Sequence, residues 1–261
     1  MAFTVHAVMP GVWHIVDCMG VCMTLLEGEN AAMLVDTGYG IEDVADFMRH
    51  MTDLPLTVFL THNHHDHAMG ARCFPETYML DADMADWDIF TNDKMRRRVL
   101  TQAIGKNLTV DEKTFLAGEI PLPKVMKPGV IDLGGLTAEI IEAPGHTPGS
   151  AVVYVPERKL LLSGDDWNPC TWLFFPQALG LREYRSNMRG IQQLPFEKVL
   201  CPHREALYDR WMFDDFFNAL TDGNLRAAEP VNIAPYEQID TCQATLPHDQ
   251  VFVFDWAKSG L

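Results

Sequence analysis

Four side chains that commonly bind metal ions stand close together in the segment Thr61–His67, which reads THNHHDH. His62 and His64 are two residues apart, and Asp66 and His67 follow shortly after them. Imidazole nitrogens and carboxylate oxygens are the ligand atoms that suit zinc, iron and manganese. Three imidazoles and one carboxylate in one short loop therefore predict a metal site, in preference to a solvated histidine-rich loop.

Three further candidate ligands follow downstream, each just after an apolar run. His146 follows a run that ends at Glu142, Asp165 follows one that ends at Ser163, and His203 follows the short run before Pro202. In layered α/β folds, ligands usually bind at strand ends. A single loop histidine would carry little weight. Four strand ends that all carry His or Asp predict one shared site.

The elements that must position these residues follow from apolar periodicity and turn residues. Helices are expected at 41–51, 181–194 and 213–220, where apolar residues recur at helical spacing. Strands are expected at 4–8, 12–16, 21–27, 31–35, 56–60, 77–80, 129–133, 136–142, 151–155, 159–163, 198–201 and 251–256.

The domain organisation expected from this order is a single domain spanning residues 1–261. The polar segment at about 81–118 is helical in tendency, which predicts a helical insertion beside the site, with Asp81 as the N-cap of its first helix. The tail from about residue 221 is expected to be a C-terminal extension.

Composition narrows the classes of function. The chain has 261 residues, 48% of them hydrophobic, and a formal net charge of −16. An acidic surface repels phosphate backbones and anionic lipid, so we expect neither nucleic acid nor a membrane as a partner. No secretory leader is visible and the six cysteines are scattered, which favours a cytoplasmic protein with reduced thiols. A small-molecule substrate is expected, and assembly into a homo-oligomer is possible.

The order of these motifs resembles the ligand series of the metallo-β-lactamase-fold hydrolase superfamily. The resemblance is carried by His62-x-His64-x-Asp66-His67, then Gly-His146, Gly-Asp165 and Pro-His203. The segment 35–38, VDTG, resembles the early motif of that family that supports the ligands. The resemblance implies an α/β (α+β) fold, a four-layer αββα sandwich of two mixed β-sheets flanked by helices, with the site in the cleft between the sheets.

The resemblance also implies a role for each residue. It implies two divalent metal ions, most simply Zn²⁺, with Fe or Mn as alternatives. Asp66 would also be catalytic, orienting a hydroxide or passing a proton to the leaving group, and Asp36 would accept a hydrogen bond from a ligating imidazole. One ion would be held by His62, His64 and His146, the other by Asp66, His67 and His203, and Asp165 would bridge them.

Within the superfamily, Asp165 argues against a true β-lactamase, whose corresponding position usually offers Cys or Ser. The site resembles those of glyoxalase II-type hydrolases and lactonases, which implies cleavage of an ester, thioester or lactone bond by a metal-bridging hydroxide. The aromatic stretch 167–175 favours a neutral or hydrophobic substrate if it lines the cleft, although it could instead form core or a subunit interface. Arg182, Arg185 and Arg189 fall opposite the apolar face of the helix expected at 181–194, so we expect them to be solvated, and Arg182 is the one of the three with an outside chance of contacting a substrate.

Three alternatives stay open. The first is a mononuclear non-haem iron oxygenase resembling persulfide dioxygenases, and the second is a phosphodiesterase. The third is a binding protein without catalytic activity on the same scaffold.

Overall fold

A computed structural model describes residues 3–261. Its first sheet has seven strands in the order β1-β2-β3-β4-β5-β6-β7. The first four form an antiparallel meander, and β5 to β7 continue the sheet in parallel. The strands are β1 Thr4–Met9, β2 Val12–Val16, β3 Cys22–Glu27, β4 Ala32–Val35, β5 Leu56–Phe59, β6 Tyr78–Met79 and β7 Lys124–Val125.

The second sheet has six strands in the order β14-β13-β11-β10-β9-β8. Strands β11 and β13 are parallel, and every other neighbouring pair in this sheet is antiparallel. Both sheets are therefore mixed. The strands are β8 Gly129–Asp132, β9 Thr137–Glu142, β10 Ala151–Val155, β11 Leu160–Leu162, β13 Lys198–Leu200 and β14 Tyr208–Asp209.

The two sheets pack face to face through an apolar core. Leu26, Met33 and Phe59 of the first sheet belong to the same buried cluster as Ile140 and Val153 of the second. All five side chains are at most 2% exposed. Removing this apolar area from water is the main favourable term that holds the sheets together.

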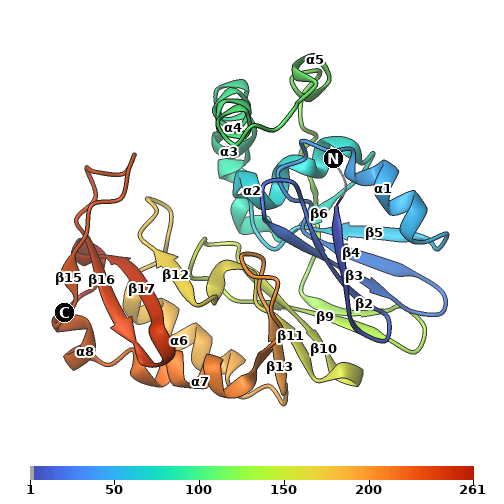
Figure 1. Ribbon diagram of the computed structural model, residues 1–261. Coiled ribbons are helices and arrows are strands. Elements are labelled where there is room, and N and C mark those ends of the chain that lie inside the picture. Colours follow the sequence, from blue (N-terminus) through green and yellow to red (C-terminus); the bar gives the residue numbers. More distant parts are fainter. Residues whose placement is uncertain (1–2) are drawn as a thin grey trace.

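Helices cover the outer face of each sheet (Figure 1). On the first sheet, Val44 and Met48 of α1 pack against Leu34. On the second, Tyr184 of α6 and Phe213 of α7 lie in one buried cluster with strands β10 and β11. The expected αββα sandwich is confirmed. The helix bounds are α1 Val44–Met51, α6 Leu181–Ile191 and α7 Arg210–Ala219.

The segment at about 81–118 is helical, as expected, and lies beside the first sheet (Figure 1). Asp81 is not an N-cap, because that position belongs to Leu80 and Asp81 lies in the first turn. The buried Arg96 fixes the segment by donating to the carbonyl of Gly118 at 2.7 Å. Its elements are the 3₁₀ helix η2 Asp81–Asp86 and the α-helices α3 Trp87–Thr91, α4 Asp93–Gly105 and α5 Glu112–Phe115.

A third sheet, in the order β12-β17-β16-β15, adds a layer that the sequence pattern does not reveal. Only its strand β17 was expected. Strand β12, which lies within the aromatic stretch, pairs in parallel with β17 about 80 residues later. Phe252 of β17 stacks on Tyr184, so α6 lies between the second and third sheets (Figure 1). The strands are β12 Cys170–Leu173, β15 Glu229–Pro230, β16 Thr241–Leu246 and β17 Gln250–Asp255.

Short helical segments complete the chain. None of the helices within residues 3–261 combines the length and the apolar character that a membrane crossing requires. These segments are α2 His65–Ala68, η1 Met69–Cys73, η3 Pro156–Arg158, η4 Gly164–Asp166, α8 Asp222–Arg226, η5 Pro247–Asp249 and η6 Trp256–Lys258.

Candidate metal centre

The early histidine cluster lies where β5 leaves the first sheet. The chain passes from Phe59 through a short bend, and His64 then stands at the N-cap of α2. Asp66 and His67 fall in the single turn of that helix. The side chains therefore project from one compact strand-to-helix corner.

The later candidates reach the same edge because of strand direction. Strand β10 runs antiparallel to β11, so the turn before β10, which carries His146, lies beside the turn after β11, which carries Asp165. Strand β13 is parallel to β11, which brings His203 to the same edge. A backbone hydrogen bond of 3.0 Å from the Ala151 amide to the Thr61 carbonyl joins this edge to the first sheet.

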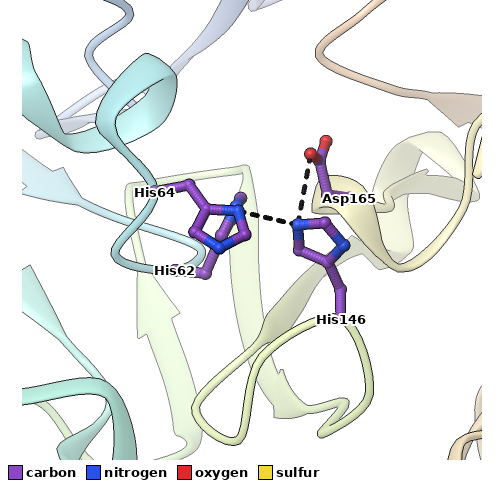
Figure 2. A group of neighbouring side chains, drawn as sticks. All are labelled: His62, His64, His146 and Asp165. Carbon is purple, nitrogen blue, oxygen red and sulfur yellow. Dashed lines mark hydrogen bonds and ion pairs between the residues drawn. The ribbon is translucent and has the colours of Figure 1, made fainter. Parts of the chain in front are cut away.

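The first group of candidate ligands is buried and tightly gathered. His62, His64, His146 and Asp165 each present one donor atom, and these four atoms lie within 4.8 Å of one another. Figure 2 shows the three imidazoles and the carboxylate turned toward a common centre. His146 Nε2 is 2.9 Å from His64 Nδ1 and 3.5 Å from Asp165 Oδ2.

The second group lies directly beside the first and shares the same carboxylate. Donor atoms of Asp66, His67 and His203 also lie within 4.8 Å of one another. Asp165 Oδ2 is 3.5 Å from His67 Nε2 and 3.1 Å from His203 Nε2. The structure therefore brings all seven sequence-predicted residues together, with Asp165 between the two groups.

The donor atoms fit divalent metal ions. Within residues 3–261, His62 Nε2, His67 Nε2 and Asp165 Oδ1 are buried and have no hydrogen-bond partner. A buried polar atom without a partner costs about 1–3 kcal/mol, so three at one site need compensation. Coordination by a cation compensates unpaired imidazole nitrogens and carboxylate oxygens together, and this donor set is that of zinc, iron or manganese.

Each of three imidazoles has a polar partner at the ring nitrogen that faces away from the centre, and this contact fixes the orientation of the ring. His67 Nδ1 donates to Asp36 Oδ2 at 2.9 Å, which leaves Nε2 free to bind a metal, as expected for Asp36. His146 Nδ1 donates to the carbonyl of Trp172 at 2.7 Å, with the same consequence. The side-chain amide of Gln177 lies 2.6 Å from His64 Nε2, so His64 presents Nδ1 to the centre. The contacts of the Trp172 carbonyl, in β12, and of Gln177, in the loop after β12, were not predicted from the sequence.

The buried carboxylate of Asp83, another residue that was missed, ties two of the ligand loops together. It accepts hydrogen bonds from the Gly149 amide at 2.6 Å and the Thr147 hydroxyl at 2.7 Å, on the loop that carries His146. It also accepts one from the Asn63 amide at 3.2 Å, between His62 and His64. A Cβ at Gly149 would lie 2.7 Å from the Asp83 carboxyl carbon, so only glycine permits this approach.

The two groups differ in their protonation behaviour. Burial and the neighbouring imidazoles hold the pKa of His62 and His64 well below the ordinary value. Burial also acts to lower the pKa of His67 and His203, but Asp165 and Asp66 outweigh it and raise both. Burial acts to raise the pKa of Asp66, yet the surrounding imidazoles lower it to about 2. Asp66 is therefore ionised at neutral pH.

A cavity of about 470 Å³ opens over both groups. Trp172 and Phe175 line it, whereas Trp167 and Phe174 are buried in the core, so the aromatic stretch contributes to both. The arginines that line it are Arg98 and Arg204, which sequence reasoning did not single out. Arg182 lies elsewhere, at the start of α6. The lining also includes Tyr39, His64, His65, Asp66, Phe90, Gln102, His146, Asp165, Asn168, Cys170, His203, Ala234 and Tyr236.

Comparison with known proteins agrees with this geometry. The sequence profile of the metallo-beta-lactamase superfamily matches residues 16–86 and 87–203, more than half of the chain. The chain therefore belongs to the metallo-beta-lactamase superfamily, as a metal-dependent hydrolase. The resemblance found in the sequence motifs is thereby confirmed.

Two relatives and one solved structure illustrate the similarity. The acyl-coenzyme A thioesterase MBLAC2 of Gallus gallus is 26% identical over 202 residues, covering 69% of this chain and 70% of that protein. The probable metallo-hydrolase YqgX of Bacillus subtilis is 27% identical over 149 residues, which cover 54% of this chain. The match spans 63% of the length of YqgX, less than two thirds of that protein. A metallo-beta-lactamase from Pontibacter korlensis superposes with a TM-score of 0.61 over 85% of this chain and 100% of that chain, at 17% identity, which shows the fold alone.

Proposed function

We propose that this hydrolase binds two divalent metal ions, most simply Zn²⁺, and cleaves an ester, thioester or lactone bond of a small substrate. The observation that carries the proposal is the pair of donor groups that share Asp165 at the floor of one cavity. His62, His64 and His146 would hold one ion. Asp66, His67 and His203 would hold the other, with Asp165 between them.

The chemistry divides between the ions and the chain. Bound cations lower the pKa of a coordinated water to about 7 and so supply a hydroxide at neutral pH. Asp66 is ionised and partly exposed to the cavity, with a side-chain exposure of 16%. Its carboxylate can orient the water and pass the proton that the water loses to the departing oxygen or sulfur. The water oxygen ends on the acyl carbon, which leaves a carboxylic acid and an alcohol or thiol.

The wall of the cavity favours an apolar acyl group. Phe90, Phe175 and Tyr236 all line it, and the Phe175 ring lies 4.7 Å from the His64 ring. Aromatic surfaces so close to the reacting centre suit an aliphatic or aromatic acyl chain. Among the three bonds we place the thioester first, because the relative from Gallus gallus is named as an acyl-coenzyme A thioesterase.

The test is a substrate panel run alongside metal analysis. It would contain p-nitrophenyl esters, acyl thioesters, lactones and phosphodiesters. We expect turnover of esters or thioesters by protein that holds close to two equivalents of metal. A single iron with oxygen uptake would reject the proposal in favour of an oxygenase, and turnover confined to phosphodiesters would reject the acyl substrate.

A further inference from the structure

The cavity over the metal centre is apolar on one side. Phe90 and Phe175 contact the His64 ring, with ring centroids 4.5 and 4.7 Å away, and Phe175 lies 5.3 Å from His146. Tyr236 packs edge-on against Phe175 at 5.4 Å. The aromatic residues therefore lie beside the first donor group, at His64 and His146, and other residues of the lining lie beside the second group.

Two cations also line the cavity. Arg204 directly follows His203 of the second group, and Arg98 projects from α4 of the insertion. Arg98 lines the same cavity as Tyr39 and His65, two neighbouring rings 5.5 Å apart, and His65 directly precedes Asp66. Arg204 therefore adjoins the second donor group, and Arg98 lines the cavity that opens over it.

These two cations are free to bind a ligand. Both side chains are exposed. Neither forms an ion pair with a carboxylate of residues 3–261, although the chain carries 36 acidic residues. One guanidinium N–H of Arg204 donates to the His203 carbonyl at 2.8 Å, which leaves its other donors available. Arginine donors match the oxygens of phosphate and carboxylate and bind them as paired hydrogen bonds.

We infer that the substrate is an acyl compound whose leaving group is anionic. Its apolar acyl part lies against Phe90, Phe175 and Tyr236, and the phosphates or carboxylates of its leaving group bind Arg98 and Arg204. The scissile bond then crosses the boundary between the two donor groups, above Asp165. This inference rests on the proposed hydrolase function and adds the charge and the orientation of the substrate.

The test compares thioether analogues that cannot be hydrolysed, measured by calorimetry on the metal-loaded protein. The probes are S-octyl coenzyme A, which carries phosphates, S-octyl glutathione, which carries carboxylates, and the neutral S-octyl N-acetylcysteamine. We expect at least one anionic probe to bind about tenfold more tightly than the neutral probe. The preferred anionic probe identifies phosphate or carboxylate as the recognised group.

Variants assign the preference to the two arginines. Arg98→Gln and Arg204→Gln should each weaken the anionic probe by about five- to tenfold and leave the neutral probe unchanged. Arg97→Gln is the matched control, since Arg97 is an exposed neighbour on the same helix and does not line the cavity. Equal affinity for all three probes, or no effect of either substitution, would overturn the inference.

Because the probes are not turned over, this result is independent of the proposed reaction. Hydrolysis of octanoyl coenzyme A and octanoyl N-acetylcysteamine is measured separately. If neither is cleaved, thioester hydrolysis is rejected while the binding data still decide the inference. If both are cleaved equally well and the arginine variants bind all probes like the unmodified protein, the hydrolase function stands and the inference fails.

Discussion

Asp36 Oδ2 accepts a hydrogen bond from His67 Nδ1 at 2.9 Å, and both side chains are almost completely buried. Asp36 follows β4 with φ 65°, in the left-handed region that is uncommon for residues other than glycine. The same carboxylate also accepts from the amide of Thr61 at 2.7 Å. Asp36, in a strained backbone conformation, therefore fixes the start of the segment 61–67 and also orients His67, a ligand of the second group.

Replacing this carboxylate should weaken the second metal site. Asp36→Asn keeps the size of the side chain but removes the charge that orients His67, so we expect the affinity for the second ion to fall about 10- to 100-fold. Competition with a chromophoric chelator measures this. Asp53→Asn, at an exposed position after α1, is the control. An unchanged affinity in the Asp36 variant would show that the hydrogen bond has no role in metal binding.

The two ions should be lost in a fixed order as the pH falls. A ligating imidazole must be unprotonated, so protons compete with the metal. The pKa of His67 and His203 is raised in the metal-free protein, whereas that of His62 and His64 is lowered. The second group therefore takes up protons at a higher pH and releases its ion first.

Equilibrium dialysis from about pH 8 to about pH 5 with metal analysis tests this order. We expect a plateau near one equivalent before the last metal is lost. In the protein with His203→Ala, that first step should disappear. Simultaneous loss of both ions, or earlier loss from the group of His62, would contradict the assignment.

Asp66 should matter for turnover far more than for folding. Asp66→Ala removes the group proposed to handle the proton, and we expect turnover to fall about 100-fold or more. The residue lies at a strand-to-helix corner outside the apolar core, so the thermal midpoint of unfolding should change little. Steady-state kinetics and thermal unfolding measure the two effects. Turnover close to that of the unmodified protein would refute the role of Asp66.

Asp83 should contribute to stability through the loops that it joins. Asp83→Ala leaves the Gly149 and Asn63 amides and the Thr147 hydroxyl without their acceptor, and we expect the free energy of unfolding to fall by about 2 kcal/mol. Urea denaturation measures this change. Asp81→Ala, two residues away and exposed, should stay within about 0.5 kcal/mol of the unmodified protein. Equal stability of the two variants would show that Asp83 is dispensable.

Much of the fold and the gathering of the candidate ligands could be predicted because the signals are local. Each of His146, Asp165 and His203 follows an apolar run closed by glycine or proline, and such runs became strands β9, β11 and β13. Parallel and antiparallel pairing then places those strand ends at one edge, as the two-sheet arrangement requires.

The third sheet could not be predicted for a physical reason. Strand β12 has only four residues, Cys170–Leu173, and exists through pairing with β17 at the other end of the chain. Strand β16, Thr241–Leu246, contains three polar residues and a small one, so its apolar alternation is weak. Such strands are specified by their partners more than by their own sequence.

The arginines that line the cavity depend on tertiary packing in the same way. Arg98 reaches the cavity because the buried Arg96, two residues earlier, donates to the Gly118 and Phe115 carbonyls and fixes α4. Nothing in the local pattern separates Arg98 from Arg97. Arg182 is exposed, as expected for a solvated residue, and it does not line the cavity, because its helix covers the far face of the second sheet, where Tyr184 is buried.

The central claim is that seven side chains hold two metal ions on either side of Asp165, and anomalous X-ray diffraction from crystals grown with zinc tests it directly. The account predicts two anomalous peaks in each chain, one beside His62, His64 and His146 and one beside Asp66, His67 and His203, with the Asp165 carboxylate between them. A single peak, or peaks away from these residues in fully zinc-loaded protein, would contradict it.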